Sequence, residues 1–348
     1  MNSVLGIAIT IAISALAATW LTSRLIHITR RRGVIDVPNH RSSHVQPTPR
    51  GGGAAIVLVA LASEAILGVA GYLDLRSALA LGIGGLLIAA VGAWDDLRSL
   101  PAGVRLAVQL VAALIAMAAL SRTSAISLGD ARLTLSGPTF VVAVLATVWL
   151  TNLYNFMDGT DGIAGIEGVV AGLSASLLLF LAGQHGLALL AASIAGASSG
   201  FLVFNWTPAR IFMGDVGSGF LGFTFAVLAV ASDRPAGVAA VWIALPLLPF
   251  VVDSTATLIR RAVRGAPLAS AHREHLYQRL VREGRSHAPV AVAFGTASTI
   301  LAGIAAVAFT YQAQFWAILS AAVVLSAAAY LLISDVVPRR NEVPLSSG

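Results

Sequence analysis

Eleven apolar segments, each near the roughly 20 residues that a helix needs to cross a bilayer, occupy most of this chain. A bilayer offers no hydrogen-bonding partners to backbone N–H and C=O groups, so such segments cross it as helices. The sequence therefore predicts an all-α polytopic integral membrane protein with about 11 transmembrane helices in a single domain over residues 1–348. The segments are residues 3–23, 53–72, 78–94, 104–121, 138–154, 163–182, 186–204, 216–232, 236–258, 289–309 and 313–334.

The composition excludes a soluble globular protein. Only 11% of the 348 residues are charged and 57% are hydrophobic, whereas a soluble domain carries about 25% charged residues. Cysteine is absent, which rules out disulfide bonds and thiolate metal sites. A net charge of +6 would suit a nucleic-acid partner. Membrane topology explains the arginines better, and we expect no nucleic-acid binding.

Arginines are distributed unevenly between the loops. With the N-terminus outside, 18 of the 22 basic residues lie inside or at the inner boundary, and four lie outside, namely Arg76, Arg122, Arg132 and Arg234. The positive-inside rule requires such a bias. The sequence thus predicts an outside N-terminus and an inside C-terminus with a short tail at residues 335–348. The basic clusters RRGVIDVPNHR and RRAVRG are explained equally well by topology and by anion binding.

Three local features are expected outside the regular helices. The outer loop SRTSAISLGDARLTLSGP alternates apolar and polar residues around Gly129 and Asp130, which favours a short β-hairpin. The inner loop 259–288 contains HREHLYQRLVREG, whose apolar spacing predicts a short interfacial helix. Pro246 and Pro249 should kink or break the ninth apolar segment.

Acidic side chains gather on the predicted inner face. They come from four separate inner loops or helix ends and are Asp95, Asp96, Asp158, Asp161, Asp215 and Asp253. Each has a structural explanation: Asp215 can be a helix N-cap, Asp158 and Asp161 precede turn glycines, and the adjacent pair can be solvated. Together with Asn152 and Asn155 on the same side, they resemble a divided site of oxygen ligands.

The type of ligand indicates an ion and a reaction. Oxygen ligands without cysteine suit Mg²⁺, with Mn²⁺ as a substitute, better than Zn²⁺. Mg²⁺ uses one or two carboxylates and completes its shell with water and phosphate oxygens, while arginines pair with the remaining phosphate charge. Acids and arginines on one face therefore predict phosphoryl transfer to or from a diphosphate at the inner membrane surface.

Five motifs, in order along nearly the whole chain, resemble one family. They are DVPNHRSSHVQPTPRGGG, WDDLRSLP, NLYNFMDGTDGIAG, FNWTPARIFMGDVGSGFLG and HREHLYQRL. The chain is similar to the bacterial polyprenyl-phosphate N-acetylhexosamine-1-phosphate transferases, and its last motif is most like the branch that serves O-antigen assembly. The resemblance implies a multi-pass enzyme of the bacterial inner membrane with a cytoplasmic active site, and relatives suggest a homodimer.

The same resemblance implies the reaction. Undecaprenyl phosphate, or another polyprenyl phosphate, attacks the β-phosphorus of a UDP-N-acetylhexosamine and UMP leaves. The lipid-pyrophosphoryl sugar formed would initiate O-antigen or another cell-envelope polysaccharide. The sequence leaves open which N-acetylhexosamine is transferred.

Residue roles follow from positions that match the family motifs. Asp215 matches the metal-binding aspartate of the FMGD motif. Asp95 and Asp96 match the paired catalytic aspartates, whose role is either to organise the metal or to deprotonate the lipid phosphate, and we expect them to act as a unit. Further matches are Asp158 and Asn155 lining the active site, Asp161 and Asn205 near the nucleoside, and Phe212 stacking on uracil. Asn152, the first residue of NLYNFMDGTDGIAG, is also assigned to substrate binding.

The inner loop between the ninth and tenth segments departs from the family pattern. Many relatives carry several histidines where this chain has HREHLYQ: His275 matches that cluster as a catalytic candidate, and Tyr277 replaces a second histidine. His272 and Arg273 are candidates for substrate binding. A lone loop histidine is otherwise more often structural.

Two arginines lie beside the acidic motifs. Arg50 of PTPRGGG is a candidate for binding substrate phosphate. Arg105, after WDD, fits either phosphate binding or a role as an anchor at the membrane interface.

Two alternatives come from other classes of membrane protein. A cation-coupled transporter would place its acids near the midplane between broken helices, whereas these acids lie at inner helix ends. A CDP-alcohol phosphotransferase would need an extended DG…AR…G…D…D spacing that this sequence lacks.

Overall fold

The computed structural model describes residues 4–36, 47–267, 272–311 and 314–337. Most of the predicted tail at 335–348 therefore lies outside the described residues. Every one of the predicted apolar segments contains a helix. The helices are α1 (Val4–Arg32), α2 (Ala54–Val69), α3 (Leu75–Leu97), α4 (Ala102–Leu120), α5 (Gly137–Met157), α6 (Ile163–Leu181), α7 (His185–Asn205), α8 (Asp215–Ser232), α9 (Ala240–Ala244), η1 (Leu245–Leu247), α10 (Leu248–Val263), α11 (Leu276–Arg282), α12 (His287–Thr310) and α13 (Phe315–Val336).

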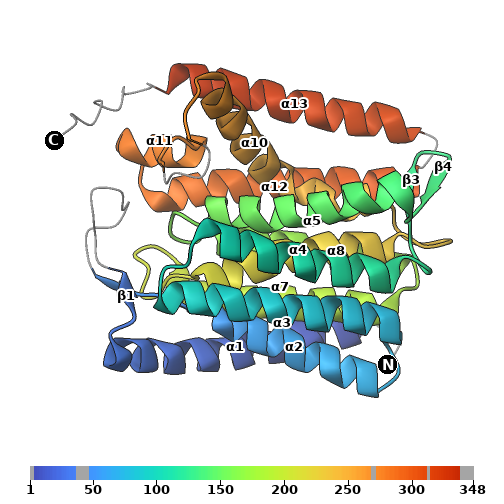
Figure 1. The fold of residues 1–348 in the computed structure, drawn as a ribbon, viewed down its shortest axis with the longest axis horizontal. Helices are drawn as coiled ribbons and strands as arrows, with labels where there is room; N and C mark the ends of the chain where they lie inside the picture. Colours follow the sequence, from blue (N-terminus) through green and yellow to red (C-terminus); the bar gives the residue numbers. More distant parts are fainter. Residues whose placement is uncertain (1–3, 37–46, 268–271, 312–313, 338–348) are drawn as a thin grey trace.

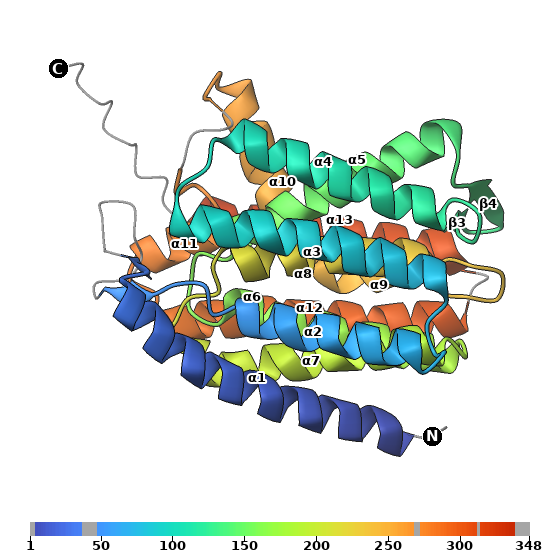
Figure 2. The ribbon, with the colours of Figure 1, turned by 60° about the horizontal axis from the view of Figure 1, so that its bottom comes forward.

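The predicted all-α membrane fold is confirmed. Among the described residues, ten helical stretches are long and apolar enough to cross a membrane, with Ala240–Val263 counted as one. The eleventh apolar helix, α2, has only 16 residues. The helices lie side by side along one direction, and α10 crosses the others at a steep angle (Figure 1). We call the end where α3, α5 and α7 finish and α4, α6 and α8 begin the arginine-rich end; it lies on the left in Figures 1 and 2.

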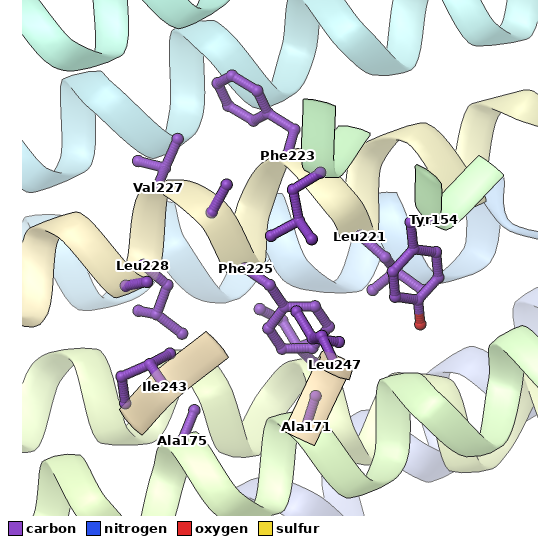
Figure 3. Close-up of a cluster of buried hydrophobic side chains, with 14 of the residues drawn as sticks. Tyr154, Ala171, Ala175, Leu221, Phe223, Phe225, Val227, Leu228, Ile243 and Leu247 are labelled. Carbon is purple, nitrogen blue, oxygen red and sulfur yellow. The ribbon is translucent and has the colours of Figure 1, made fainter. Parts of the chain in front are cut away.

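Helix α8 is the centre of the bundle. Its residues from Val216 to Ser232 are all buried, and it packs against α3, α5 and α9. Side chains of α8 such as Phe225 meet Tyr154 of α5 and residues Ile243 and Leu247 of the broken ninth segment (Figure 3). By contrast, α1 and α13 are mostly exposed and lie at opposite edges of the bundle (Figure 1). The position of α8 therefore fixes where its first residue, Asp215, lies.

Glycines allow the helices to approach α8 closely. A Cβ atom on Gly92 of α3 would lie 2.5 Å from the backbone oxygen of Asp215. A Cβ on Gly53 would lie 2.4 Å from Cα of Gly217. Helix association in membranes depends on such close packing, because apolar surface gains little by leaving lipid. These contacts bring the loop after β2 and the end of α3 directly against the start of α8.

The predicted break in the ninth segment is confirmed. Pro246 lies within the short 3-10 turn η1, and Pro249 begins α10, which then crosses the bundle toward the arginine-rich end. The predicted short helix follows as α11. It is not a free interfacial helix, because Leu276 and Tyr277 are buried and Leu276 packs against Tyr330 and Val337.

The predicted outer hairpin is also present. Strand β3 (Ala125–Leu128) pairs antiparallel with β4 (Ala131–Thr134), and Gly129 in the turn has φ +63°. Buried Asp233 holds the hairpin by accepting hydrogen bonds from Ser127 N at 2.7 Å and Ser127 Oγ at 2.6 Å. A second small pair, β1 (Ile35–Asp36) with β2 (Thr48–Pro49), lies at the arginine-rich end and was not predicted.

The close approach of α3 and α8 makes a stability prediction. Gly92→Ala should lower the thermal stability of the detergent-solubilised protein by about 1–3 kcal/mol, because the new methyl group meets backbone that cannot yield. Helix propensity alone favours alanine over glycine by about 1 kcal/mol. Gly303→Ala in α12, where a Cβ meets nothing within 4 Å, is the matched control and should be neutral or stabilising. Equal melting temperatures for both variants would contradict the packing argument.

Candidate active site

Two arginines connect three aspartates at the start of α8. Arg50 places Nε 2.8 Å from Oδ1 of Asp96 and Nη2 2.5 Å from Oδ1 of Asp215. Arg105, in the first turn of α4, places Nη1 2.9 Å from Oδ2 of Asp215 and 3.4 Å from Oδ2 of Asp95. The acids predicted from separate loops are thus brought together, and Arg105 lies in the site rather than at the lipid interface.

Asp96 also caps α8 from outside that helix. Its Oδ1 accepts a hydrogen bond from Asp215 N at 2.9 Å, and its Oδ2 accepts one from Val216 N at 3.1 Å. These are N–H groups that a helix start leaves without an intrahelical partner, and the helix dipole favours a negative charge there. The explanation of Asp215 as the N-cap is wrong: the N-cap position is Gly214.

Gly214 is required by this arrangement. Its φ is +76°, a region that L-residues with a side chain rarely adopt, and a Cβ there would lie 2.4 Å from Oδ2 of Asp96. The glycine in the FMGD motif therefore lets the carboxylate of one helix reach the first N–H groups of another.

Asp95 completes the acidic group. Its Oδ1 accepts a hydrogen bond from Leu100 N at 2.8 Å, which orients the carboxylate, and the carboxyl groups of Asp95 and Asp215 face each other at hydrogen-bonding distance. Like charges so close together need a cation or a proton between them. Arg105 contacts both carboxylates.

The asparagines of α5 differ in their surroundings. Asn155 donates from Nδ2 to Ser218 Oγ at 2.9 Å and also contacts Asp215, so it lies in the site. Asn152, one turn earlier, donates to Gln109 Oε1 at 2.6 Å and to Val148 O at 2.8 Å. It joins α5 to α4, and its assignment to substrate binding stays a prediction.

Asp158 ends α5 beside the arginine pair. Burial raises the pKa of its carboxyl group well above the usual range; Arg50 acts against that shift, whereas Asp215 and Asp96 add to it. For Arg50, burial disfavours the charge, but Asp96 and Asp215 outweigh it and raise the pKa. Arg50 is therefore a permanent cation among acids.

Asp161 and Asn205 fasten loops to each other. Oδ2 of Asp161 accepts hydrogen bonds from Thr207 Oγ1 and Ala209 N, each at 3.0 Å, and its Oδ1 lies 3.2 Å from Nδ1 of His287. Burial would raise the pKa of Asp161, but the hydrogen bonds from His287 and Ala209 lower it overall.

Asn205 is 3% exposed, accepts from Gly162 N at 3.0 Å and donates to Ile211 O at 3.0 Å. These contacts fix the segment that leads to the FMGD motif. Binding of the nucleoside by Asp161 and Asn205 stays a prediction, and the geometry favours a structural role for both.

Backbone pairing between residues 49–53 and 212–213 positions Arg50. Phe212 N donates to Pro49 O at 2.8 Å, Gly52 N to Phe212 O at 2.9 Å and Gly53 N to Met213 O at 2.8 Å. Phe212 is only half-buried, and its stacking on uracil stays a prediction.

His272 and His275 belong to the segment of residues 272–275 that leads into α11, which we call the histidine loop. Through α11 it lies against the loop around Asp158. His275 is 2% exposed, and its ring stacks near Phe156 and Tyr277, with centroids 6.1 and 5.9 Å away. The hydroxyl of Tyr277 donates to Phe156 O at 2.8 Å, and a Cβ on Gly159 would strike that hydroxyl. The tyrosine that replaces a family histidine is therefore buried and links the two loops by a hydrogen bond.

Buried Asp253 holds the start of α11. It accepts hydrogen bonds from Leu276 N at 2.7 Å and Tyr277 N at 3.3 Å, and its Oδ1 lies 3.8 Å from Nδ1 of His275. Beside it, Glu274 pairs with Arg261 and Arg264. His272 and Arg273 are half-buried in the same segment, and their assignment to substrate binding stays a prediction.

Sequence reasoning missed several of these partners. Asp253 was noted as an inner acid without a role, and Gln109, Ser218 and His287 carried no signal because each belongs to an ordinary apolar helix or helix start. Only their contacts with Asn152, Asn155 and Asp161 reveal them.

The fold and site together define a class. The chain is a polytopic membrane protein in which acids and arginines from α3, α4, α8 and the β2 loop meet Asn155 of α5 at one end of the bundle. That combination is typical of a membrane enzyme that handles phosphorylated substrates.

Comparison with known proteins gives the family. Residues 78–233 match the family model described as glycosyl transferase family 4. The chain is 30% identical over 286 residues to a probable undecaprenyl-phosphate N-acetylglucosaminyl 1-phosphate transferase of Bacillus subtilis (strain 168), covering 81% of this chain and 79% of the relative. It is 26% identical over 309 residues to the undecaprenyl-phosphate alpha-N-acetylglucosaminyl 1-phosphate transferase of Escherichia coli (strain K12), covering 84% and 81%. The chain belongs to the polyprenyl-phosphate N-acetylhexosamine-1-phosphate transferases of glycosyl transferase family 4.

The surroundings of His272 lead to a prediction of how the stability of the protein depends on pH. Burial, with His275 and Arg261, lowers the pKa of His272 to about 4 from the 6.5 of a free histidine. Between those values the unfolded chain binds more protons than the folded protein, so stability should rise with pH across this range. The melting temperature should fall on acidification from pH 6.5 to 4, and His272→Gln should reduce that fall. Parallel curves for the two proteins would contradict a neutral, half-buried His272.

Proposed function

We propose that this protein transfers N-acetylhexosamine-1-phosphate from a UDP-N-acetylhexosamine to undecaprenyl phosphate or another polyprenyl phosphate. The observation that carries the proposal is the convergence of Arg50 and Arg105 on Asp95, Asp96 and Asp215 in a chain of this family. The relatives' names favour N-acetylglucosamine as the sugar. The lipid product would start O-antigen or another cell-envelope polysaccharide.

The reaction is a single displacement at phosphorus. A phosphate oxygen of the lipid forms a bond to the β-phosphorus, the bond from that phosphorus to the bridging oxygen breaks, and UMP leaves with the electron pair. The bond between sugar and oxygen is untouched, so the anomeric configuration is retained. A lipid phosphate has a second pKa near that of phosphoserine, about 6, and is already largely ionised at neutral pH. Positioning and charge stabilisation therefore supply most of the acceleration, as in other phosphoryl transfers.

The residues divide this work. Arg50 and Arg105 present guanidinium groups that suit diphosphate oxygens, while the half-buried ring of Phe212 offers a surface for uracil. Asp158 and Asn155 line the same end of the bundle, beside Asp215. His275 reaches this region through the contact of Tyr277 with the Asp158 loop.

The acids fit a magnesium ion. Asp95 and Asp215 face each other, and the set contains oxygen ligands only. Among the described residues, no group of three or more histidine, cysteine or acidic side chains is arranged to hold a metal. Mg²⁺ needs only one or two carboxylates, because water and substrate phosphates complete its shell. When bound, Mg²⁺ would neutralise charge on the diphosphate, with Asp215 as its chief protein ligand and Mn²⁺ as a substitute.

The orientation follows from charge. The end that holds the site also carries most of the arginines, whereas Arg76, Arg122, Arg132 and Arg234 belong to the opposite end. Together with the positive-inside rule, this distribution supports a site at the cytoplasmic face, with the N-terminus outside, and the family supports the bacterial inner membrane as its location. This face is where a nucleotide sugar is available. The homodimer suggested by relatives stays a prediction.

The first experiment measures UMP release by purified protein given undecaprenyl phosphate, Mg²⁺ and a panel of UDP-N-acetylhexosamines. We expect UMP and one lipid-pyrophosphoryl sugar, both lost with EDTA and in Asp215→Ala. Asp130→Ala, an exposed acid in the outer hairpin turn, is the control and should keep full activity. Absence of UMP from every donor, with folded protein, would overturn the proposal and revive the cation-coupled transporter, which ion flux in proteoliposomes would test.

Asp96 should matter for turnover more than for donor binding. Asp96→Asn removes a charge beside Arg50 and can accept only one of the two α8 N–H bonds. We expect kcat to fall at least about 100-fold with a much smaller change in KM for the UDP-sugar. Asp74→Asn, at the opposite end of the same helix, keeps a good N-cap and should have wild-type kinetics. Equal losses in kcat and in donor affinity would count against this role.

A further inference from the structure

We propose that Arg50 and Arg105 compete with the divalent cation for the same carboxylate oxygens and move to the donor's diphosphate when the cation binds. The inference rests on the proposed function and deepens it, because it makes cation binding and donor binding two halves of one exchange. Arg50 and Arg105 then act as counter-ions that change partners, in addition to binding substrate.

Both carboxylate oxygens of Asp215 contact a guanidinium nitrogen. Oδ1 lies 2.5 Å from Arg50 Nη2, and Oδ2 lies 2.9 Å from Arg105 Nη1. A Mg²⁺ ion must approach an oxygen ligand to about 2.0–2.1 Å. A cation placed there repels both guanidinium groups at contact distance. Charge repulsion at Asp215 therefore favours the withdrawal of at least one arginine when the ion binds.

The same pattern holds for the other two acids. Arg50 bridges Asp96 and Asp215, and Arg105 bridges Asp215 and Asp95. The guanidinium groups thus lie between the carboxylates. This explains why no three acidic or histidine side chains in the described part of the chain form a ready metal group.

Arg105 has hydrogen-bonding capacity that the protein does not use. Its Nε is buried and has no hydrogen-bond partner among the described residues. A buried donor without a partner is costly, and a donor on a cation is costlier still. A phosphate oxygen that reached Nε would remove this cost, so the side chain gains by moving onto an anionic ligand.

Both side chains have room to move while their backbones stay fixed. Each is 33% exposed. Arg50 follows β2, and the backbone on either side of it is held in place because Pro49 and Gly52 are hydrogen-bonded to Phe212. Arg105 lies in the first turn of α4. A change of side-chain rotamer can therefore transfer each guanidinium from carboxylate to phosphate without moving a helix.

The exchange has a thermodynamic consequence. The bound cation weakens the ion pairs between the carboxylates and the arginines. The released arginines then pair with the diphosphate through forked hydrogen bonds. Each ligand then increases the affinity for the other by the same factor. Removing one arginine should therefore strengthen cation binding in the absence of nucleotide and weaken donor binding.

The test measures Mn²⁺ binding to the full-length protein in detergent by electron paramagnetic resonance, with no nucleotide or lipid present. Arg105→Gln and Arg50→Gln should each lower the Kd for Mn²⁺ by at least about tenfold, because a unit charge at contact with the carboxylates is removed. The matched control is Arg98→Gln, which removes the same charge from an exposed side chain in the loop after α3. We expect a change of less than about threefold there, because exposed charges are screened.

Three results would overturn the inference. An unchanged or higher Kd for Mn²⁺ in both arginine variants would mean that the arginines do not compete with the cation. An equal gain in Mn²⁺ affinity in Arg98→Gln would mean that only the total positive charge of the loops matters, and not contact with the carboxylates. KM for the UDP-sugar should rise in Arg105→Gln while the Kd for Mn²⁺ falls, and parallel changes would also contradict the exchange.

This outcome is separate from the proposed activity. Mn²⁺ binding is measured without substrate, so a failed UMP assay with wild-type protein would not alter it. Conversely, UMP release with unchanged Mn²⁺ affinity in both variants would leave the transferase proposal intact and reject the exchange.

Discussion

The capping of α8 by Asp96 is the interaction on which the site depends. Helix α8 is buried almost throughout, so its first N–H groups lie inside the bundle and need partners from another segment. Asp96 supplies them from α3, and in doing so it sets the distance between the α3 acids and Asp215. The close approach of the helices at Gly92 and the positive φ of Gly214 allow that bond to form. One hydrogen-bonded carboxylate thus joins the packing of the membrane bundle to the placement of the chemistry.

Around that cap, the charged side chains of the site form ion pairs with one another. Three acids and two arginines alternate in space, and each arginine touches two acids. Each of these charges has an opposite charge in contact, which offsets part of the cost of burying it. The site also suits ligands of both signs. A divalent cation would take the place of the arginines at the carboxylates, and a diphosphate would take the place of the carboxylates at the arginines. Stability and substrate binding therefore use the same side chains.

The histidine loop reaches the site by a different route. It lies far along the chain from Asp158, yet Tyr277 contacts both Phe156 and Gly159, and Asp253 anchors the start of α11. The break at η1 makes this possible, because it turns α10 away from the other helices and carries the loop to the arginine-rich end (Figure 1). A proline pair in the sequence is thus the cause of a contact between two distant motifs.

The sequence by itself determined the membrane fold, the apolar helices, the broken ninth segment, the outer hairpin and the set of acids at one end. These follow from composition, from the period of the apolar residues and from local turn chemistry, all of which act over a few neighbouring residues. Only the tertiary structure decided that Gly214 rather than Asp215 is the N-cap, that Arg105 joins the acids, and that Asp161 and Asn205 tie loops together. It also decided that Asn152 is paired with Gln109 of α4. The physical reason is that a polar side chain near a membrane takes whichever partner the packing brings within about 3 Å, and residues distant in sequence become partners only after the helices have packed.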